Sequence, residues 1–198
     1  MKKNFLEAVE HRRSVYAIGG DILTGRERVT EIVRHAVKHV PSTFNSQSAR
    51  AVILFEESHR RLWDLVLEVL QGIVNENDFA ATAKKIDGFR RGAATVLFFE
   101  DRAVVEDLMS RYSLYADKFP EFSLEASGML QFVVWTALEN EGYGASLQHY
   151  NPLIDEVVRE EWSLPQSWQL RSQLVFGSVV EWPGEKSFIP LEERVLVF

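Results

Sequence analysis

The 198-residue sequence contains no cysteine. Disulfide bonds, thiolate metal ligands and a cysteine nucleophile are therefore excluded. Because the remaining side chains are poor hydride carriers, any redox activity must use a bound cofactor. Glycine and proline, with 11 and 6 residues, are not enriched either, which argues against extended disorder.

Long apolar runs and an excess of positive charge are also missing. The longest apolar run near the middle of the chain, residues 93–99, is far too short to cross a bilayer. The N-terminal segment carries charges throughout and lacks the apolar core of a signal peptide. The net charge of -7 argues against non-specific binding to nucleic acids, which requires basic patches. We therefore expect a cytoplasmic protein whose partners include neither membranes nor nucleic acids.

Helices and short strands alternate along the chain. Apolar periodicity and capping residues predict helices over residues 2–11, 25–40 (after Thr24), 58–70, 78–86 (from Asp78), 123–138 (from Ser123) and 152–162, and one more after Asp101. Residues 18–24 are expected to form a loop, and β-forming runs predict strands over residues 51–55, 95–99, 145–147, 174–180 and 194–198, the first of them buried. This alternation indicates an α+β or α/β fold with a sheet of four or five strands. With no repeat or linker, we expect one domain over residues 1–198.

Two segments are more apolar than the surface of a small monomer allows. The C-terminal tail, residues 194–198 with the sequence RVLVF, would aggregate as a free edge strand, so we expect it to pair with its own sheet or a partner's. The helix predicted at residues 124–138 is apolar on nearly every side. Both features favour a homodimer. The alternative is that both segments belong to the core of a single copy.

The first candidate site is Arg12-Arg13-Ser14, directly after the first predicted helix. Two guanidinium groups and a hydroxyl can clamp a phosphate or a carboxylate, because arginine donates in a planar fork. The alternative is structural, since basic residues at the C-terminus of a helix also complement its dipole.

The second candidate site is the polar stretch between the second helix and the first strand, residues 41–50. It contains Ser42, Thr43, Asn45 and Gln47. Amide groups donate and accept at once, which suits the alternating edge of a pyrimidine ring. An ordinary polar loop is the alternative, but turns favour glycine, aspartate and asparagine over a Gln-Ser-Ala-Arg run.

Further candidates lie near the C-terminal half. Residues 144–151 combine Gln148 and His149 with small residues, which permit close approach of the backbone to a flat ligand. Arg194 stands between acidic residues and the apolar tail, where an ion pair is the ordinary interpretation. His35 and His39 have the spacing of helix neighbours, and we interpret them as solvated surface residues, so no metal site is expected.

Taken together, these segments resemble the FMN-dependent nitroreductase family. That family carries an Arg-Ser motif after the first helix, a Pro-Ser-Ser/Thr-x-Asn-x-Gln motif after the second, and a basic residue near the C-terminus. The chain has matching residues in the same order at positions 12–14, at positions 41–47 (PSTFNSQ) and at Arg194. The second motif is the most specific, and the resemblance spans nearly the whole chain.

The details are similar to the subgroup named after the yeast fatty acid repression mutant proteins. There the second motif continues Gln-Ser-x-Arg, as residues 47–50 do, and a Gly-x-Gly-x-x-Leu-Gln-His-Tyr-Asn block follows, as in residues 142–151. Typical nitroreductases have a Pro-x-Glu-Gly segment in place of that block. This departure leaves the FMN core intact and leaves the substrate and the nicotinamide preference open.

The resemblance implies an α+β fold with a central, mostly antiparallel sheet, and FMN at the interface of a homodimer whose C-terminal segments wrap the partner. By this resemblance, residues 12–14 would hold the phosphate, ribityl chain or pyrimidine edge, and Arg194 would add to the phosphate clamp. A further set would reach the flavin ring, some of it from the partner subunit: Ser42, Thr43, Asn45, Gln47, Lys85, Gln148 and His149.

The implied activity is that of an NAD(P)H oxidoreductase. NADH or NADPH would deliver hydride to flavin N5, and a nitroaromatic or quinone acceptor would then take its place in a ping-pong cycle. Because the flavin carries the chemistry, no catalytic side chain is expected. One alternative is a flavin-binding protein of stress response or lipid-linked regulation with only slow reductase activity. A second is an α+β interaction protein without a cofactor.

Overall fold

The computed structural model describes residues 3–198. Its elements follow in the order α1 (Phe5–His11), β1 (Ala17–Gly19), α2 (Arg26–His39), β2 (Ala49–Phe55), α3 (Glu56–Gln71), α4 (Glu76–Arg90), β3 (Ala94–Asp101), α5 (Arg102–Arg111), α6 (Phe119–Asn140), β4 (Gly144–Gln148), α7 (Asp155–Glu161) and β5 (Trp168–Glu181). Short 3-10 turns lie at Thr43–Asn45, Ser113–Tyr115 and Leu191–Glu193.

The five strands form one antiparallel sheet around β5. β5 pairs with β3, with β4 and with β1, while β2 pairs with β3. All of these pairings are antiparallel, and the parallel contact between Ser14 and Ala145 is an isolated bridge. The expected α+β fold with a mostly antiparallel sheet of four to five strands is therefore confirmed.

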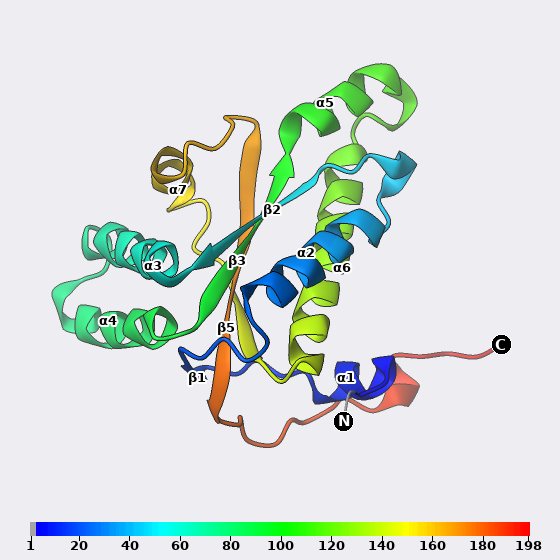
Figure 1. Ribbon diagram of the computed structural model, residues 1–198. Coiled ribbons are helices and arrows are strands. Elements are labelled where there is room, and N and C mark those ends of the chain that lie inside the picture. Colours follow the sequence, from blue (N-terminus) through cyan, green and yellow to red (C-terminus); the bar gives the residue numbers. More distant parts are fainter. Residues whose placement is uncertain (1–2) are drawn as a thin grey trace.

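Helices cover both faces of this sheet (Figure 1). α3, α4 and α7 pack against one face, and α2 and α6 pack against the other. β3 lies between the two cores: Leu97 and Phe99 contribute to the first, and Val96 and Phe98 to the second. Because both of its faces are buried, β3 is a continuous apolar run and does not alternate apolar with polar residues.

The helix α6 runs along one side of the molecule for 22 residues. It begins at Phe119, earlier than the expected Ser123, because Pro120 occupies the first turn, where an amide needs no helical partner. Gly142, with a φ of +95°, lets the chain reverse after its C-terminus. The helix is less buried than expected, since Leu124 is 50% exposed and Met129 is 43% exposed.

The starts of two helices also differ from the expectation. Gly25 is the N-cap of α2, and the expected cap Thr24 instead donates its amide to the hydroxyl of Tyr143. Asn75 is the N-cap of α4, and Asp78 lies in its first turn, where its amide donates to the Asn75 side chain. In both cases a neighbouring residue competes better for the cap position, which periodicity does not detect.

Four of the five expected strands are present, with differences in extent and exposure. β5 begins at Trp168, well before residue 174, and β1, which was not expected, overlaps the start of the segment expected to be a loop. β2 is an edge strand with mostly half-buried side chains, so the expectation of a buried strand at residues 51–55 was wrong. The expected cap at Asp101 is confirmed, because its carboxylate accepts from the amide of Ala103.

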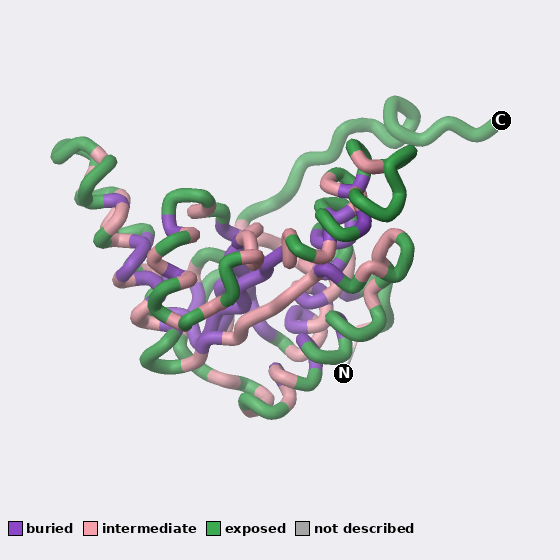
Figure 2. Tube along the Cα trace, turned by 90° about the horizontal axis from the view of Figure 1, so that it is seen from above, coloured by how far each residue is buried: buried purple, intermediate pink, exposed green. Residues whose placement is uncertain are grey.

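The tail does not form the strand expected at residues 194–198. After the turn at Leu191–Glu193 it runs away from the sheet, and its side chains are exposed (Figure 2). Val197, for example, is 92% exposed. Within the described part of one copy, these apolar side chains therefore have no strand or core to pack against.

A buried hydrogen-bonded chain links α3 to β3. Trp63 donates its indole N–H to the Thr95 hydroxyl oxygen at 3.2 Å, and Nδ1 of His59 lies 2.9 Å from the same oxygen. Nε2 of His59 lies 3.2 Å from the carbonyl oxygen of Arg90, which can only accept, so Nε2 carries the proton and Nδ1 accepts from Thr95. Every member of the chain is thereby satisfied with a neutral imidazole.

Replacing Thr95 by valine should destabilise the fold by roughly 2–4 kcal/mol, because the buried Trp63 N–H and His59 Nδ1 each lose their partner. Thr136→Val is the matched control: this threonine is 5% exposed and its hydroxyl has no partner, so its removal should change stability little. Urea unfolding of both variants measures the difference. Equal effects of the two substitutions would show that the Thr95 hydroxyl does not hold the chain together.

Acid should weaken the fold through His59. Burial lowers the pKa of His59 to about 4, from 6.5 in the unfolded chain, so the unfolded state binds more protons between these values. The contribution of His59 is then complete above pH 6.5 and falls as the pH drops towards 4, by roughly 3 kcal/mol in total. Urea unfolding at pH 7 and pH 5 measures the effect. The free energy of unfolding should change less between these pH values in His59→Gln than in the exposed control His39→Gln. An equal change in both variants would contradict this account.

Candidate functional site

The first motif follows α1 as an extended segment beside β4. A capping box between Asn4 and Glu7 fixes the start of α1, and Arg12 is its C-cap. Ser14 then forms the parallel bridge with Ala145, and the next amide donates to the Ala145 carbonyl at 2.9 Å. The short helix and the bridge together fix the backbone on both sides of Arg12 and Arg13.

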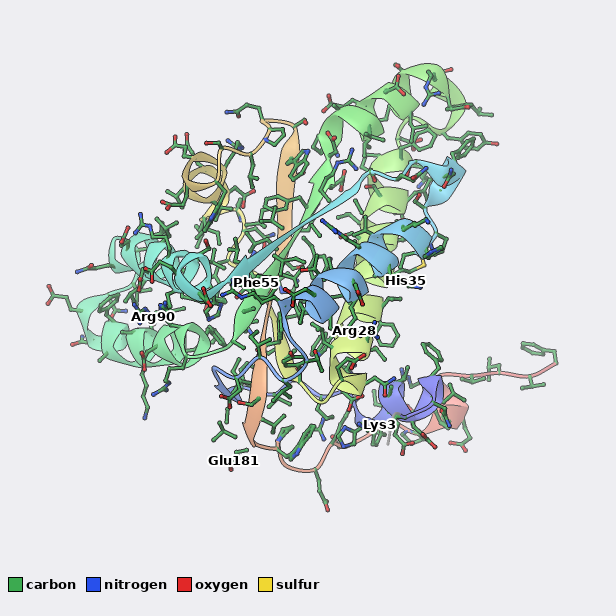
Figure 3. The ribbon with its side chains drawn as sticks, viewed as in Figure 1. Lys3, Arg28, His35, Phe55, Arg90 and Glu181 are labelled. Carbon is green, nitrogen blue, oxygen red and sulfur yellow. The ribbon has the colours of Figure 1, made fainter. Side chains whose placement is uncertain are left out.

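The C-terminal end of α6 holds this segment in place. The carboxylate of Glu139, which is 4% exposed, accepts from Nζ of Lys3 at 2.8 Å. Nδ1 of His11 lies 2.6 Å from the same carboxylate oxygen. Figure 3 shows Lys3 at the end of α6 next to α1. The residue that precedes Arg12 is thereby tied to the long helix.

Arg12 and Arg13 line one cavity with Lys186. Nη2 of Arg13 donates to the carbonyl of Gly184 at 2.9 Å, which brings the segment after β5 across the motif. The full lining of the cavity is Val9, Glu10, Arg12, Arg13, Glu185, Lys186 and Phe188. Three basic residues and two glutamates, Glu10 and Glu185, therefore line one cavity, with a small excess of positive charge.

Arg12 is the least satisfied of these cations. Its guanidinium lies over the Trp135 ring, 4.4 Å from the centroid, and its Nε is buried without a hydrogen-bond partner. Burial and the charge of Arg13 lower the pKa of Arg12 below its usual value, against an opposing effect of Glu139. These features describe a cation that the fold holds without neutralising it.

Sequence reasoning missed Lys186 and chose Arg194 as the C-terminal cation. Lys186 stands alone in an ordinary polar segment, so no motif singled it out; only the contact of that segment with Arg13 does so. Arg194 lies at the end of the Leu191–Glu193 turn on the exposed tail and does not line this cavity. Its predicted contact with a phosphate stays a prediction.

The second motif is a strained loop. Phe44, Asn45 and Gln47 have φ values of 56°, 50° and 50°, in the left-handed region that non-glycine residues rarely adopt. Ser42 stabilises the loop by accepting from the Gln47 amide at 3.0 Å, and Arg50 donates to the Gln47 carbonyl at 2.7 Å. Such conformations cost of order 1–3 kcal/mol each and concentrate at functional sites.

This geometry leaves the motif's amide side chains available. The side chains of Asn45 and Gln47 are exposed, and Ser42 and Thr43 are half-buried. Gln47 and Ser42 also line a groove of about 650 Å³ between α2, β2 and α6. The Ser42 hydroxyl and a long 3.4 Å hydrogen bond from the Gln47 side chain to the Asn45 carbonyl hold the loop, while the Asn45 side chain and the remaining polar groups of Gln47 face outward.

The third motif, residues 142–151, consists of β4 and the residues on either side of it. Gly144 is required by protein packing, because a Cβ there would lie 2.9 Å from the Val15 side chain. The Gln148 side chain is buried and donates to the Ser146 hydroxyl at 3.1 Å, so its amide group is used within the protein. His149, the next residue, is exposed.

Lys85 is an exposed residue of α4. Its Nζ is 5.7 Å from the centroid of the Phe89 ring, which in turn is 6.4 Å from the ring of Tyr16, next to β1. Lys85 does not line the cavity of Arg12 and Arg13, and its predicted contact with the flavin stays a prediction.

The second motif lies at the opposite end of α6. Arg12 contacts Trp135 near the C-terminus of the helix, while Ser48, just after the second motif, contacts Ser123 near its N-terminus at 3.2 Å between hydroxyl oxygens. With a rise of about 1.5 Å per residue, the two helix positions are about 18 Å apart. Within one copy, the structure brings the first and third motifs together and keeps the second apart (Figure 1).

The nitroreductase family model matches residues 9–178, which include the first three motifs and every strand except the last residues of β5. The chain belongs to the nitroreductase family. Family membership makes it an oxidoreductase. The chain is 35% identical over 190 residues to the nitroreductase FRM2 of Saccharomyces cerevisiae, covering 94% of this chain and 93% of the yeast protein. The expected similarity to the fatty acid repression mutant subgroup is thereby confirmed.

Solved structures agree with this assignment. The nitroreductase CinD from Lactococcus lactis in complex with chloramphenicol is 45% identical, with a TM-score of 0.90 over 98% of this chain and 100% of CinD. CinD has also been solved with 4-nitrophenol and with nicotinic acid. A structure from Exiguobacterium sibiricum in complex with FMN is 15% identical, with a TM-score of 0.73 over 99% of this chain and 98% of that one, and shares the fold.

Residues 3–198 of this nitroreductase show neither a metal-binding cluster nor a membrane-spanning helix. The rings of His35 and His39 lie 4.4 Å apart on the exposed side of α2. In that part of the chain, no group of three or more histidine, aspartate or glutamate side chains could hold a metal ion. No helix there has both the length and the apolar character that a membrane span requires.

Proposed function

We propose that this nitroreductase is an NAD(P)H oxidoreductase that binds FMN at two equivalent sites of a homodimer. Each site would combine residues 12–14, Lys85, Lys186 and residues 148–149 of one copy with residues 42–47 of the other. The observation that carries the proposal is the separation of the motifs along α6. Because a rigid helix keeps them about 18 Å apart in one copy, a second copy would be the means of bringing them to one ligand.

The first half of each site fits the phosphate of FMN. Arg12, Arg13 and Lys186 surround one cavity, and the unpartnered Nε of Arg12 is a buried donor without a protein acceptor. Phosphate oxygens accept several charge-assisted hydrogen bonds at once, and arginine matches them bidentately. Arg194 would contact the phosphate together with Arg12, Arg13 and Lys186 only if the tail followed a different path. It therefore stays a secondary candidate.

The second half fits the ring system. Asn45 and Gln47 present amides that donate and accept, as the N3–H and the carbonyl oxygens of the pyrimidine edge require. Ser42 and Thr43 would lie next to them, and the backbone of residues 148–149 would approach from the first copy. Lys85 would face the N1 and C2=O side, where reduction of the ring places negative charge.

The surfaces that would form the dimer are apolar and exposed. α6 presents Leu124, Met129 and Phe132, and Gly128 lies among them with open space where a Cβ would point, so a second helix can approach closely. The tail and the free edge of β2 are a second complementary pair, since an apolar strand from one copy can add to the open edge of the other. This would supply the partner strand that residues 194–198 lack within one copy.

Bound FMN would supply hydride chemistry at its N5 atom, with NADH or NADPH as the reductant. The protein would orient the ring, exclude water and stabilise charge through Lys85 and the arginines, so no catalytic acid or base is required. The acceptors would be nitroaromatic or quinone-type molecules. The aromatic ligands of CinD support a flat acceptor that stacks on the ring.

Subunit complementation tests the shared site. A chain with Arg12→Ala and Arg13→Ala and a chain with Asn45→Ala and Gln47→Ala should each form homodimers that bind FMN roughly 10-fold or more weakly. A heterodimer of the two chains, purified with different tags, should bind one FMN with wild-type affinity, because one of its sites contains no substitution. Thermal unfolding of both apo homodimers controls for folding.

Two other outcomes of this experiment would contradict different parts of the proposal. A heterodimer that binds FMN only with the weakened affinity of the two homodimers, and has no site of wild-type affinity, would show that both motifs of a site come from one chain. A wild-type protein that stays monomeric and takes up no FMN would remove the cofactor assignment itself.

Stopped-flow mixing distinguishes the oxidoreductase from a slow flavin-binding protein. Anaerobic NADPH or NADH should abolish the visible absorbance of the FMN-loaded protein within seconds, and a nitroaromatic should then restore it. Loss of absorbance over many minutes with both reductants would instead favour the regulatory flavin-binding alternative.

A further inference from the structure

The contact between Arg12 and Trp135 is the closest of its kind in the described structure. The guanidinium carbon lies 4.4 Å from the ring centroid, whereas the other arginine and lysine contacts with aromatic rings range from 5.1 to 5.9 Å. At this distance the ring face attracts the cation through its quadrupole. Trp135 belongs to α6 and does not line the cavity that Arg12 lines.

Arg12 differs from most other arginines of the chain in its lack of an ionic partner. Arg28 and Arg90, for example, pair with Glu141 and Asp64 at 2.7 Å. Within residues 3–198 no carboxylate lies within ion-pair distance of Arg12, and its Nε is buried and unpartnered. The aromatic ring therefore supplies the stabilisation that a carboxylate supplies elsewhere, without competing for the N–H donors.

The attachment to α6 has two points. Trp135 contacts the guanidinium of Arg12. Glu139, one turn later on α6, binds His11, the residue immediately before Arg12. The backbone and the tip of the side chain are thus both fixed by the same rigid element. A long side chain that is already ordered loses less conformational entropy when it binds an anion.

We propose that Trp135 is a positioning residue that holds the Arg12 guanidinium ready for the phosphate group of FMN. This inference rests on the proposed FMN site. Trp135 itself contacts neither the ring nor the reacting atoms in this assignment, and acts through Arg12 alone. Its effect is therefore confined to ligands that carry the phosphate.

The comparison of FMN with riboflavin tests this role, because riboflavin lacks the phosphate. Trp135→Leu should weaken FMN binding by roughly 3- to 30-fold and leave riboflavin binding unchanged. Trp135→Phe keeps a smaller ring face and should lose less. Trp162→Leu, at another partly buried tryptophan, is the matched control and should not change the ratio of the two affinities. Fluorescence titration measures both affinities, and the thermal midpoint of each apo variant controls for folding.

Four results would overturn the inference. A parallel loss of FMN and riboflavin affinity in Trp135→Leu, with Trp135→Phe behaving alike, would indicate a merely structural role. Additive losses in Arg12→Ala and Trp135→Leu would show that the two residues act independently. An unchanged FMN affinity in Trp135→Leu would refute the inference alone, whereas a wild-type protein that binds neither flavin would refute the proposed function as well.

Discussion

The rigidity of α6 is the constraint on which the rest of the structure depends. The helix packs against the sheet along its length, fixes the N-terminal segment through Glu139 and Trp135 at one end, and contacts Ser48 at the other. Because a hydrogen-bonded helix does not shorten, the polar groups at its two ends cannot approach each other in one copy. In the proposed homodimer a ligand that contacts both sets would lie between two molecules, and the exposed apolar face of α6 is where the second molecule would pack.

The fold treats its buried polar groups in two different ways. Between α3 and β3, the Trp63, Thr95 and His59 side chains satisfy one another completely, which stabilises and specifies that core. Around the first motif, two buried polar atoms lack a hydrogen-bond partner, namely Nε of Arg12 and one carboxylate oxygen of Glu139. The cost of an unsatisfied buried group is about 1–3 kcal/mol. Buried atoms without a partner also occur elsewhere, for example the hydroxyls of Thr136 and Ser172, so at Arg12 it is the position beside two other cations that distinguishes the group.

Sequence patterns predicted the fold and the order of its elements well, because apolar periodicity reports directly on burial. The strand at β3 and the helix α3 are examples, since their apolar residues face the two cores. Caps and exposure were harder to predict. Gly25 displaced Thr24 at a helix start, and β2 proved to be an edge strand, because both depend on neighbours that are distant in sequence.

Residue types located the first two motifs of the candidate site, and the structure added how they are held. The strained loop is visible in sequence only as an unusual Gln-Ser-Ala-Arg run. Neither Lys186 nor Trp135 stands out in the sequence. Lys186 is found through the contact of its segment with Arg13, and Trp135 through the geometry of a helix that lies more than a hundred residues from Arg12. Contacts of such sequence separation leave no local pattern.

The net charge of the chain places a further demand on this site. A protein with a net charge of -7 repels phosphorylated ligands at long range, so affinity for FMN has to come from groups that act at close range. Cations that are paired with carboxylates, like most on this surface, contribute little to an incoming anion, because a new contact has to replace an existing one. An arginine stabilised by an aromatic face keeps its full charge and its donors. In an acidic chain, such an arrangement concentrates an available positive charge in one small region of an otherwise negatively charged protein.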